Sequence, residues 1–77
     1  QRMTLWELPQ GKHCTIRSIL ANTPEKYRQR LTALGFQPGG FVSCVMKTSL
    51  GAPRLYQVDS AVYSLDDKIA KFIEISV

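Results

Sequence analysis

Residues 30–40, RLTALGFQPGG, constrain the chain more than any other stretch, because they end one element and begin another within a few residues. A helical pattern runs into Gly35, which can close a helix in the left-handed conformation without steric cost. Pro38 and Gly39 suit the centre of a tight turn, since proline fixes φ and glycine accepts positive φ. The segment therefore predicts a helix that stops at Gly35 and a strand that starts soon after the turn.

The helix that ends there is predicted over residues 22–35. Thr23 is expected to cap it, with Pro24 at the first helical position and Glu25 in the first turn, where the helix dipole favours an anion. The apolar stripe at spacing i, i+4 and i+7 consists of Tyr27, Leu31 and Leu34. Three basic residues lie off this stripe and are expected to face solvent: Lys26, Arg28 and Arg30.

Short segments rich in β-branched and aromatic residues fill most of the remaining chain. Gly and Pro residues separate them, including Gly51 and Pro53 in the expected loop at 49–53. The strands are predicted at residues 13–20, 41–48, 54–58, 61–65 and 72–77. This pattern predicts a mainly β fold, a small closed or partly open barrel of about five strands, in a single domain over residues 1–77.

Finer expectations concern the strand at 13–20 and two short helical turns. Alternation along the strand puts Cys14 and Ile16 on one face and Ile19 on the opposite face. Thr4 and Glu7 have the spacing of a capping box, and residues 66–71 read as one helical turn capped by Asp66.

Composition limits the class of protein without naming a function. Ten Lys and Arg residues against six Asp and Glu residues give a formal net charge of +4. This charge favours acidic partners, and it equally serves solubility, because the basic residues are scattered. No apolar run approaches the roughly 18 residues of a membrane span, and no signal peptide pattern opens the chain. Two cysteines are too few for a disulfide scaffold. A reducing cytoplasmic setting is expected; whether Gln1 and Arg2 precede a native start at Met3 is left open.

No motif indicates catalysis, a cofactor or a metal site. Structural zinc usually takes four nitrogen and sulfur ligands in paired spacings, whereas the chain offers the single histidine His13 and the separated Cys14 and Cys44. Adjacent strand residues such as His13 and Cys14 also point to opposite faces. A nucleic-acid surface is a weaker alternative, because small barrels can bind nucleic acid through basic and aromatic side chains. The residues that could form it are Arg28, Arg30, Lys47, Arg54, Tyr27 and Tyr56. Core packing explains the aromatic residues better.

Residues 27–40, YRQRLTALGFQPGG, resemble a segment of the ferrous iron transport protein A (FeoA) family, in which a helix ends at Leu-Gly and a Pro-Gly turn leads into a strand. Residues 3–19 resemble the opening of the family pattern, and residues 49–76 resemble its tail. The resemblance thus covers nearly the whole chain. Its structural turns fall at Gly35, Pro38, Gly39, Gly51 and Pro53.

The resemblance implies an SH3-like β-barrel with one α-helix inserted after the first strand. It also implies a small non-enzymatic accessory protein of bacterial ferrous iron uptake, cytoplasmic and recruited to the inner membrane by its partner. That partner is FeoB, the membrane transporter with a GTP-binding domain. The exposed side of the helix is then the expected partner-binding surface, through Lys26, Arg28 and Arg30.

Three departures from the family pattern lie in the second half of the chain. Ala52 stands where the family often has Asp, Asp59 and Ser60 replace a pair that begins with Arg, and Asp66 replaces Arg. The changes at Asp59 and Asp66 make basic positions acidic, so a family surface that relies on those arginines is not expected here.

Two other functions stay open on the sequence. The SH3-like domain of an iron-dependent transcriptional repressor resembles this family in fold. A small barrel that binds nucleic acid would show steep salt dependence of binding. Self-association through exposed edge strands is a further possibility for any small barrel.

Overall fold

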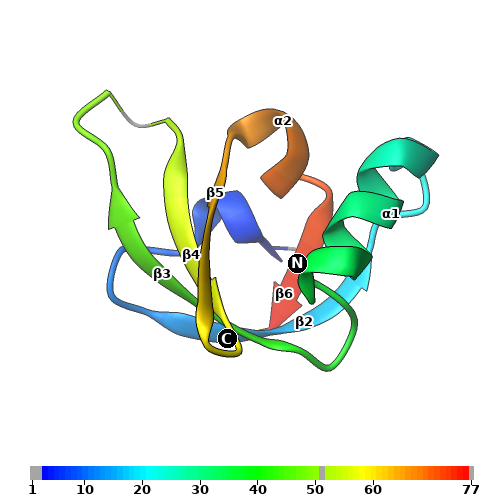
Figure 1. Cartoon of the computed structure of the whole chain (residues 1–77), viewed down its shortest axis with the longest axis horizontal. Coiled ribbons are helices and arrows are strands. Elements are labelled where there is room, and N and C mark those ends of the chain that lie inside the picture. Colours follow the sequence, from blue (N-terminus) through cyan, green and yellow to red (C-terminus); the bar gives the residue numbers. More distant parts are fainter. Residues whose placement is uncertain (1–2, 51, 77) are drawn as a thin grey trace.

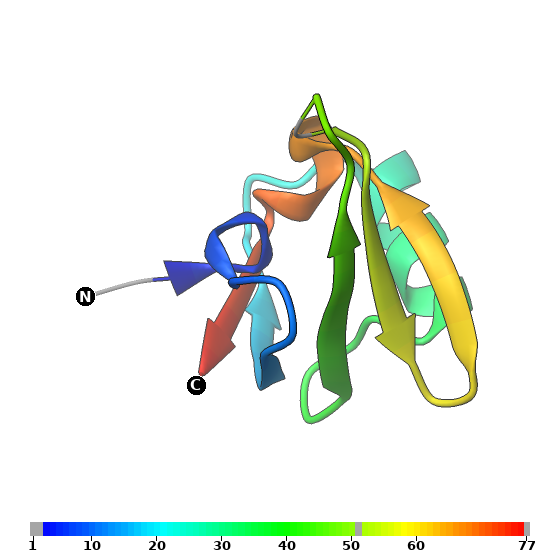
Figure 2. The ribbon, with the colours of Figure 1, turned by 90° about the vertical axis from the view of Figure 1, so that its left-hand side faces the viewer.

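A computed structural model describes residues 3–50 and 52–76 and arranges six strands in one antiparallel sheet. The strand order is β1-β6-β2-β3-β4-β5, and the sheet curves around its core (Figures 1 and 2). The strands are β1 (Met3–Thr4), β2 (His13–Ile19), β3 (Phe41–Lys47), β4 (Arg54–Val58), β5 (Ala61–Leu65) and β6 (Ile73–Ser76). The helices are the 3-10 turn η1 (Leu5–Glu7), α1 (Glu25–Leu34) and α2 (Asp67–Ala70).

The expectation of about five strands, with one helix after the first, is corrected in one respect. The two residues of β1 pair with β6, Met3 opposite Ile75 and Thr4 opposite Glu74, so α1 follows the second strand. The helical turn expected at residues 66–71 is confirmed as α2, which connects β5 to β6 and is capped by Asp66, whose Oδ1 accepts the Lys68 amide at 3.1 Å. Within the described residues β1 and β5 are the two edges of the sheet, which does not close on itself (Figure 2).

The core lies on the concave side of the sheet, where η1 and the two helices cover it (Figure 1). Leu5 and Leu8, at either end of η1, are both fully buried. The inward face of β3, which its apolar pattern left undecided, carries Val42 and Cys44. Phe41, on the same strand, is 58% exposed. Gly51 lies outside the described residues, and Pro53 lies in a bend just before β4.

A β-bulge in β2 overturns the expected position of Ile19. The pairing of β2 with β6 shifts register between Ile16 and Ser18, which places one extra residue in β2. Ile16 and Ile19 are therefore both buried, although an uninterrupted strand would send them to opposite faces.

The amino-terminal end of α1 differs from the prediction in its cap. Pro24 occupies the N-cap position, with extended ψ and no side-chain cap hydrogen bond. Thr23 is buried and its hydroxyl donates to the Leu20 carbonyl at 2.6 Å, so it closes the preceding turn instead of capping the helix.

The carboxyl-terminal end of α1 is closed by Gly35 in the left-handed conformation, at φ 104°. The Gly35 amide donates to Thr32 O at 3.1 Å, and the Phe36 amide donates to Leu31 O at 2.8 Å. These two bonds form the Schellman arrangement, and Phe36 is fully buried beneath it. The helix therefore ends by a backbone conformation that glycine adopts most easily.

The turn at residues 37–40 joins α1 back to the sheet. The Gly40 amide donates to Gln37 O at 2.9 Å, with Pro38 and Gly39 between them and Gly39 at φ 87°. Gly39 and Gly40 also bond to Ile16: the Gly39 amide donates to Ile16 O, and the Ile16 amide donates to Gly40 O, both at 2.8 Å. The turn thereby joins the chain to β2 just before β3 begins.

Replacing Gly35 with alanine is expected to lower the free energy of unfolding by about 1–2 kcal/mol, because a Cβ strains the left-handed conformation. The added Cβ would also lie 3.4 Å from Asp59 Oδ2. Gly35→Asn should cost less, since asparagine tolerates this conformation better. Urea unfolding of the three proteins measures both values, and equal stability of Gly35→Ala and the unchanged chain would contradict the argument.

Candidate interaction surface

The residues considered for metal binding or catalysis lie apart. His13 is exposed on the outer face of β2, and its ring lies 5.0 Å from the Phe41 ring, centroid to centroid. Cys14 points into the core on the opposite face. Among residues 3–50 and 52–76, no group of three His, Cys, Asp or Glu side chains is placed to hold a metal ion.

Cys14 and Cys44 are free thiols in the core, on the neighbouring strands β2 and β3. Burial raises the pKa of Cys14 to about 11, because the interior disfavours the thiolate. Burial also raises the pKa of Cys44, against the opposing influence of Lys47 and Arg54. Both thiols are therefore held in the neutral form, which is a poor nucleophile and a poor metal ligand.

The raised pKa of Cys14 predicts a loss of stability in alkaline solution. The shift from 9.0 to about 11 means that the unfolded chain releases the thiol proton at a lower pH than the folded chain. The stabilisation is complete below the lower value and is lost as pH rises through the higher one, by about 1–3 kcal/mol. Urea unfolding across this range should show the decline. A Cys14→Ala chain should decline less, and an identical pH dependence would contradict the assignment.

The aromatic and basic residues considered for nucleic acid are partly engaged in packing. Tyr56 is fully buried, and its hydroxyl donates to Leu5 O at 3.4 Å. The Arg54 guanidinium lies 3.8 Å from the centre of the Trp6 ring and donates to the Trp6 carbonyl. Tyr56 thus offers no ring face for a base, as the core interpretation of the aromatics expected.

The three basic residues of α1 have different environments. Lys26 and Arg30 are exposed, and the Lys26 ammonium lies 5.4 Å from the centre of the Tyr27 ring. The Arg28 side chain is only 35% exposed. The apolar stripe packs as expected, with Leu31 fully buried and Tyr27 and Leu34 partly buried against the core.

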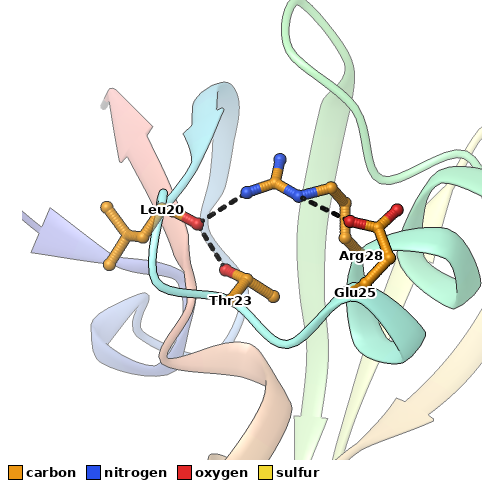
Figure 3. A network of polar contacts seen from close by, with 4 residues as sticks. All are labelled: Leu20, Thr23, Glu25 and Arg28. Carbon is orange, nitrogen blue, oxygen red and sulfur yellow. Dashed lines mark hydrogen bonds and ion pairs between the residues drawn. The ribbon is translucent and has the colours of Figure 1, made fainter.

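Arg28 connects the helix to the segment that follows β2 (Figure 3). Its Nη2 donates to the Leu20 carbonyl at 2.9 Å, the same oxygen that accepts from the Thr23 hydroxyl. Its Nε lies 4.0 Å from Glu25 Oε1, one turn earlier on α1. Arg28 therefore helps to hold α1 in place, whereas the sequence indicated only that it lies off the apolar stripe.

Arg28→Met is expected to lower the free energy of unfolding by about 0.5–1.5 kcal/mol, because the Leu20 carbonyl loses a hydrogen bond. Arg30→Met should change it by less than about 0.5 kcal/mol, since Arg30 is exposed and its side chain has no such bond within the described residues. Thermal or urea unfolding of the matched pair measures the difference. Equal effects would contradict the structural role of Arg28.

A small pocket of about 160 Å³ opens where α1, the end of β5 and α2 meet. Tyr27 and Arg30 line it from α1, Ser64 from β5, and Asp66, Lys68 and Ile69 from the α2 region. Sequence reasoning singled out Arg30, treated Asp66 as a helix cap and as a departure from a family arginine, and missed Lys68. No local signal relates Lys68 to Arg30, because only the packing of α2 beside α1 brings them to one pocket.

Comparison with known proteins places this structure in a family. The FeoA domain model matches residues 3–77. The chain belongs to the FeoA family. The resemblance seen in the sequence is thereby confirmed, and with it the association with ferrous iron transport, in a small accessory family that is not a known enzyme family.

Solved structures agree in fold. FeoA from Stenotrophomonas maltophilia, an SH3 domain protein crystallised with zinc, is 32% identical, with a TM-score of 0.84 over 96% of this chain and 89% of that one. Iron(II) transport protein A from Clostridium thermocellum is 25% identical, with a TM-score of 0.87 over 97% of this chain and 45% of that one. No curated protein matches the chain by sequence.

A manganese-dependent transcriptional repressor also shares the fold, with a TM-score of 0.86 at 14% identity. The match covers 97% of this chain and 36% of the repressor, so it shows a likeness of fold alone. No helix in the described part of the chain is long and apolar enough to cross a membrane.

Proposed function

We propose that this FeoA-family chain is a non-enzymatic accessory protein that binds the ferrous iron transporter FeoB at its cytoplasmic side. The observation that carries the proposal is the family match over residues 3–77. The match to the Stenotrophomonas maltophilia relative covers 96% of this chain. That relative is described as a candidate activating factor of bacterial ferrous iron transport. The whole of residues 1–77 acts as one domain in this role.

The outer face of α1 is the surface that we assign to the transporter. Lys26 and Arg30 are exposed there, so both can reach acidic groups of a partner. Arg28 contributes indirectly, because its bond to the Leu20 carbonyl holds the helix that presents the other two. Each exposed charge at the edge of a protein interface changes the binding free energy by a few tenths to about 1 kcal/mol.

Binding to detergent-solubilised full-length FeoB from the same source, with and without guanine nucleotide, tests the proposal. We expect saturable binding that weakens several-fold in the Lys26→Glu/Arg30→Glu chain, because two attractive charges become repulsive. Lys12→Glu/Lys47→Glu is the matched control. The Lys12 carbonyl accepts the Cys44 amide of β3 at 2.9 Å, and Lys47 ends the same strand, which lies on the other side of the molecule from α1 (Figure 1). Dependence on nucleotide would indicate action through the GTP-binding domain, and independence would indicate stabilisation of the transporter complex.

Equal weakening by the two double variants would leave the transporter as partner and remove α1 as the docking surface. Absence of binding by the unchanged chain in every nucleotide state would overturn the proposed function. Retained folding of each variant is checked by circular dichroism, so that loss of binding is not confused with unfolding.

A further inference from the structure

The pocket between α1, β5 and α2 contains two cationic side chains from elements that are far apart in the sequence. Arg30 comes from the last part of α1 and Lys68 from α2, and both are exposed. Within the described residues neither side chain has an ion-pair or hydrogen-bond partner in the protein. Ser64 and Tyr27 line the same pocket. The site therefore has unpaired cations and neutral polar groups around one opening.

One acidic side chain in the lining sets the charge that the pocket can accept. Asp66 lies at the pocket, and its Oδ1 accepts the Lys68 backbone amide at 3.1 Å, which holds the carboxylate at the start of α2. Together with Arg30 and Lys68, which line the same pocket, Asp66 leaves the lining with one net positive charge. A group with one negative charge matches this better than a phosphate dianion, which Asp66 repels.

The size and walls of the pocket also select its ligand. A volume of about 160 Å³ is well below the roughly 300 Å³ at which sites for cofactors and drug-sized ligands begin. Leu65 and Ile69 are buried and supply apolar wall, against which short methylene groups can pack. The space therefore fits a carboxylate on a short aliphatic stem.

We propose that this pocket binds the carboxylate of a glutamate or aspartate side chain on a protein partner, with Arg30 and Lys68 as its two cationic contacts. The inference rests on the proposed function, which supplies a protein partner. Arg30 belongs both to the pocket and to the outer face of α1, so the pocket is continuous with the proposed docking surface. Guanidinium and ammonium donors form the stronger, charge-assisted hydrogen bonds to such a carboxylate.

The pocket itself is tested by NMR titration of the isotope-labelled full chain with butyrate, which carries one carboxylate on the same short stem as a glutamate side chain. We expect saturable shifts of the Ser64 and Lys68 amides, and their loss in an Arg30→Gln/Lys68→Gln chain. Lys12→Gln/Lys47→Gln removes the same number of positive charges and should retain the shifts. Equal shifts with the uncharged butyramide, or tighter binding of inorganic phosphate than of butyrate, would overturn the proposal.

Binding to full-length FeoB separates this inference from the proposed function. The Arg30→Gln/Lys68→Gln chain is expected to bind at least tenfold more weakly than the unchanged chain, and Lys12→Gln/Lys47→Gln equally well. If the unchanged chain binds and Arg30→Gln/Lys68→Gln binds with the same affinity, the pocket is excluded and the proposed function stands. If the unchanged chain does not bind, the proposed function and its acidic partner both fail, and the butyrate titration then tests the carboxylate site alone.

Discussion

The pair of hydrogen bonds between Ile16 and the Gly39–Gly40 segment is the constraint on which the rest of the structure depends. Between β2 and β3 the chain leaves the sheet, forms α1 and must return beside the strand that it left. The left-handed Gly35 ends the helix, and the following turn places Gly39 and Gly40 against Ile16, each bond at 2.8 Å. Because β3 begins at Phe41, this attachment also sets the register of β3 on β2.

This part of the fold could be predicted from the sequence because each of its signals is local. A glycine after an apolar stripe and a proline-glycine turn specify backbone conformations that neighbouring residues do not alter much. The position of Ile19 could not be predicted in the same way. It depends on the bulge that β2 adopts against β6, a strand from the opposite end of the chain.

The candidate site could likewise be predicted only where its signals are local. Helical periodicity correctly separated the apolar side of α1 from Lys26, Arg28 and Arg30, but it could not distinguish the three. Arg28 is engaged by a carbonyl oxygen of Leu20, which belongs to the loop before the helix. The place of Lys68 beside Arg30 requires the packing of α2 near α1, which no spacing in the sequence encodes.

The pocket is assembled from α1, β5 and α2, and it exists only when all three are in their folded positions. An occupant would therefore bind the folded chain and leave the unfolded chain untouched. By mass action such a ligand raises apparent stability, by about 2.7 kcal/mol when its concentration is a hundredfold above its dissociation constant. For a domain of this size that gain is a large share of the total free energy of unfolding, so the bound partner would stabilise the fold that recognises it.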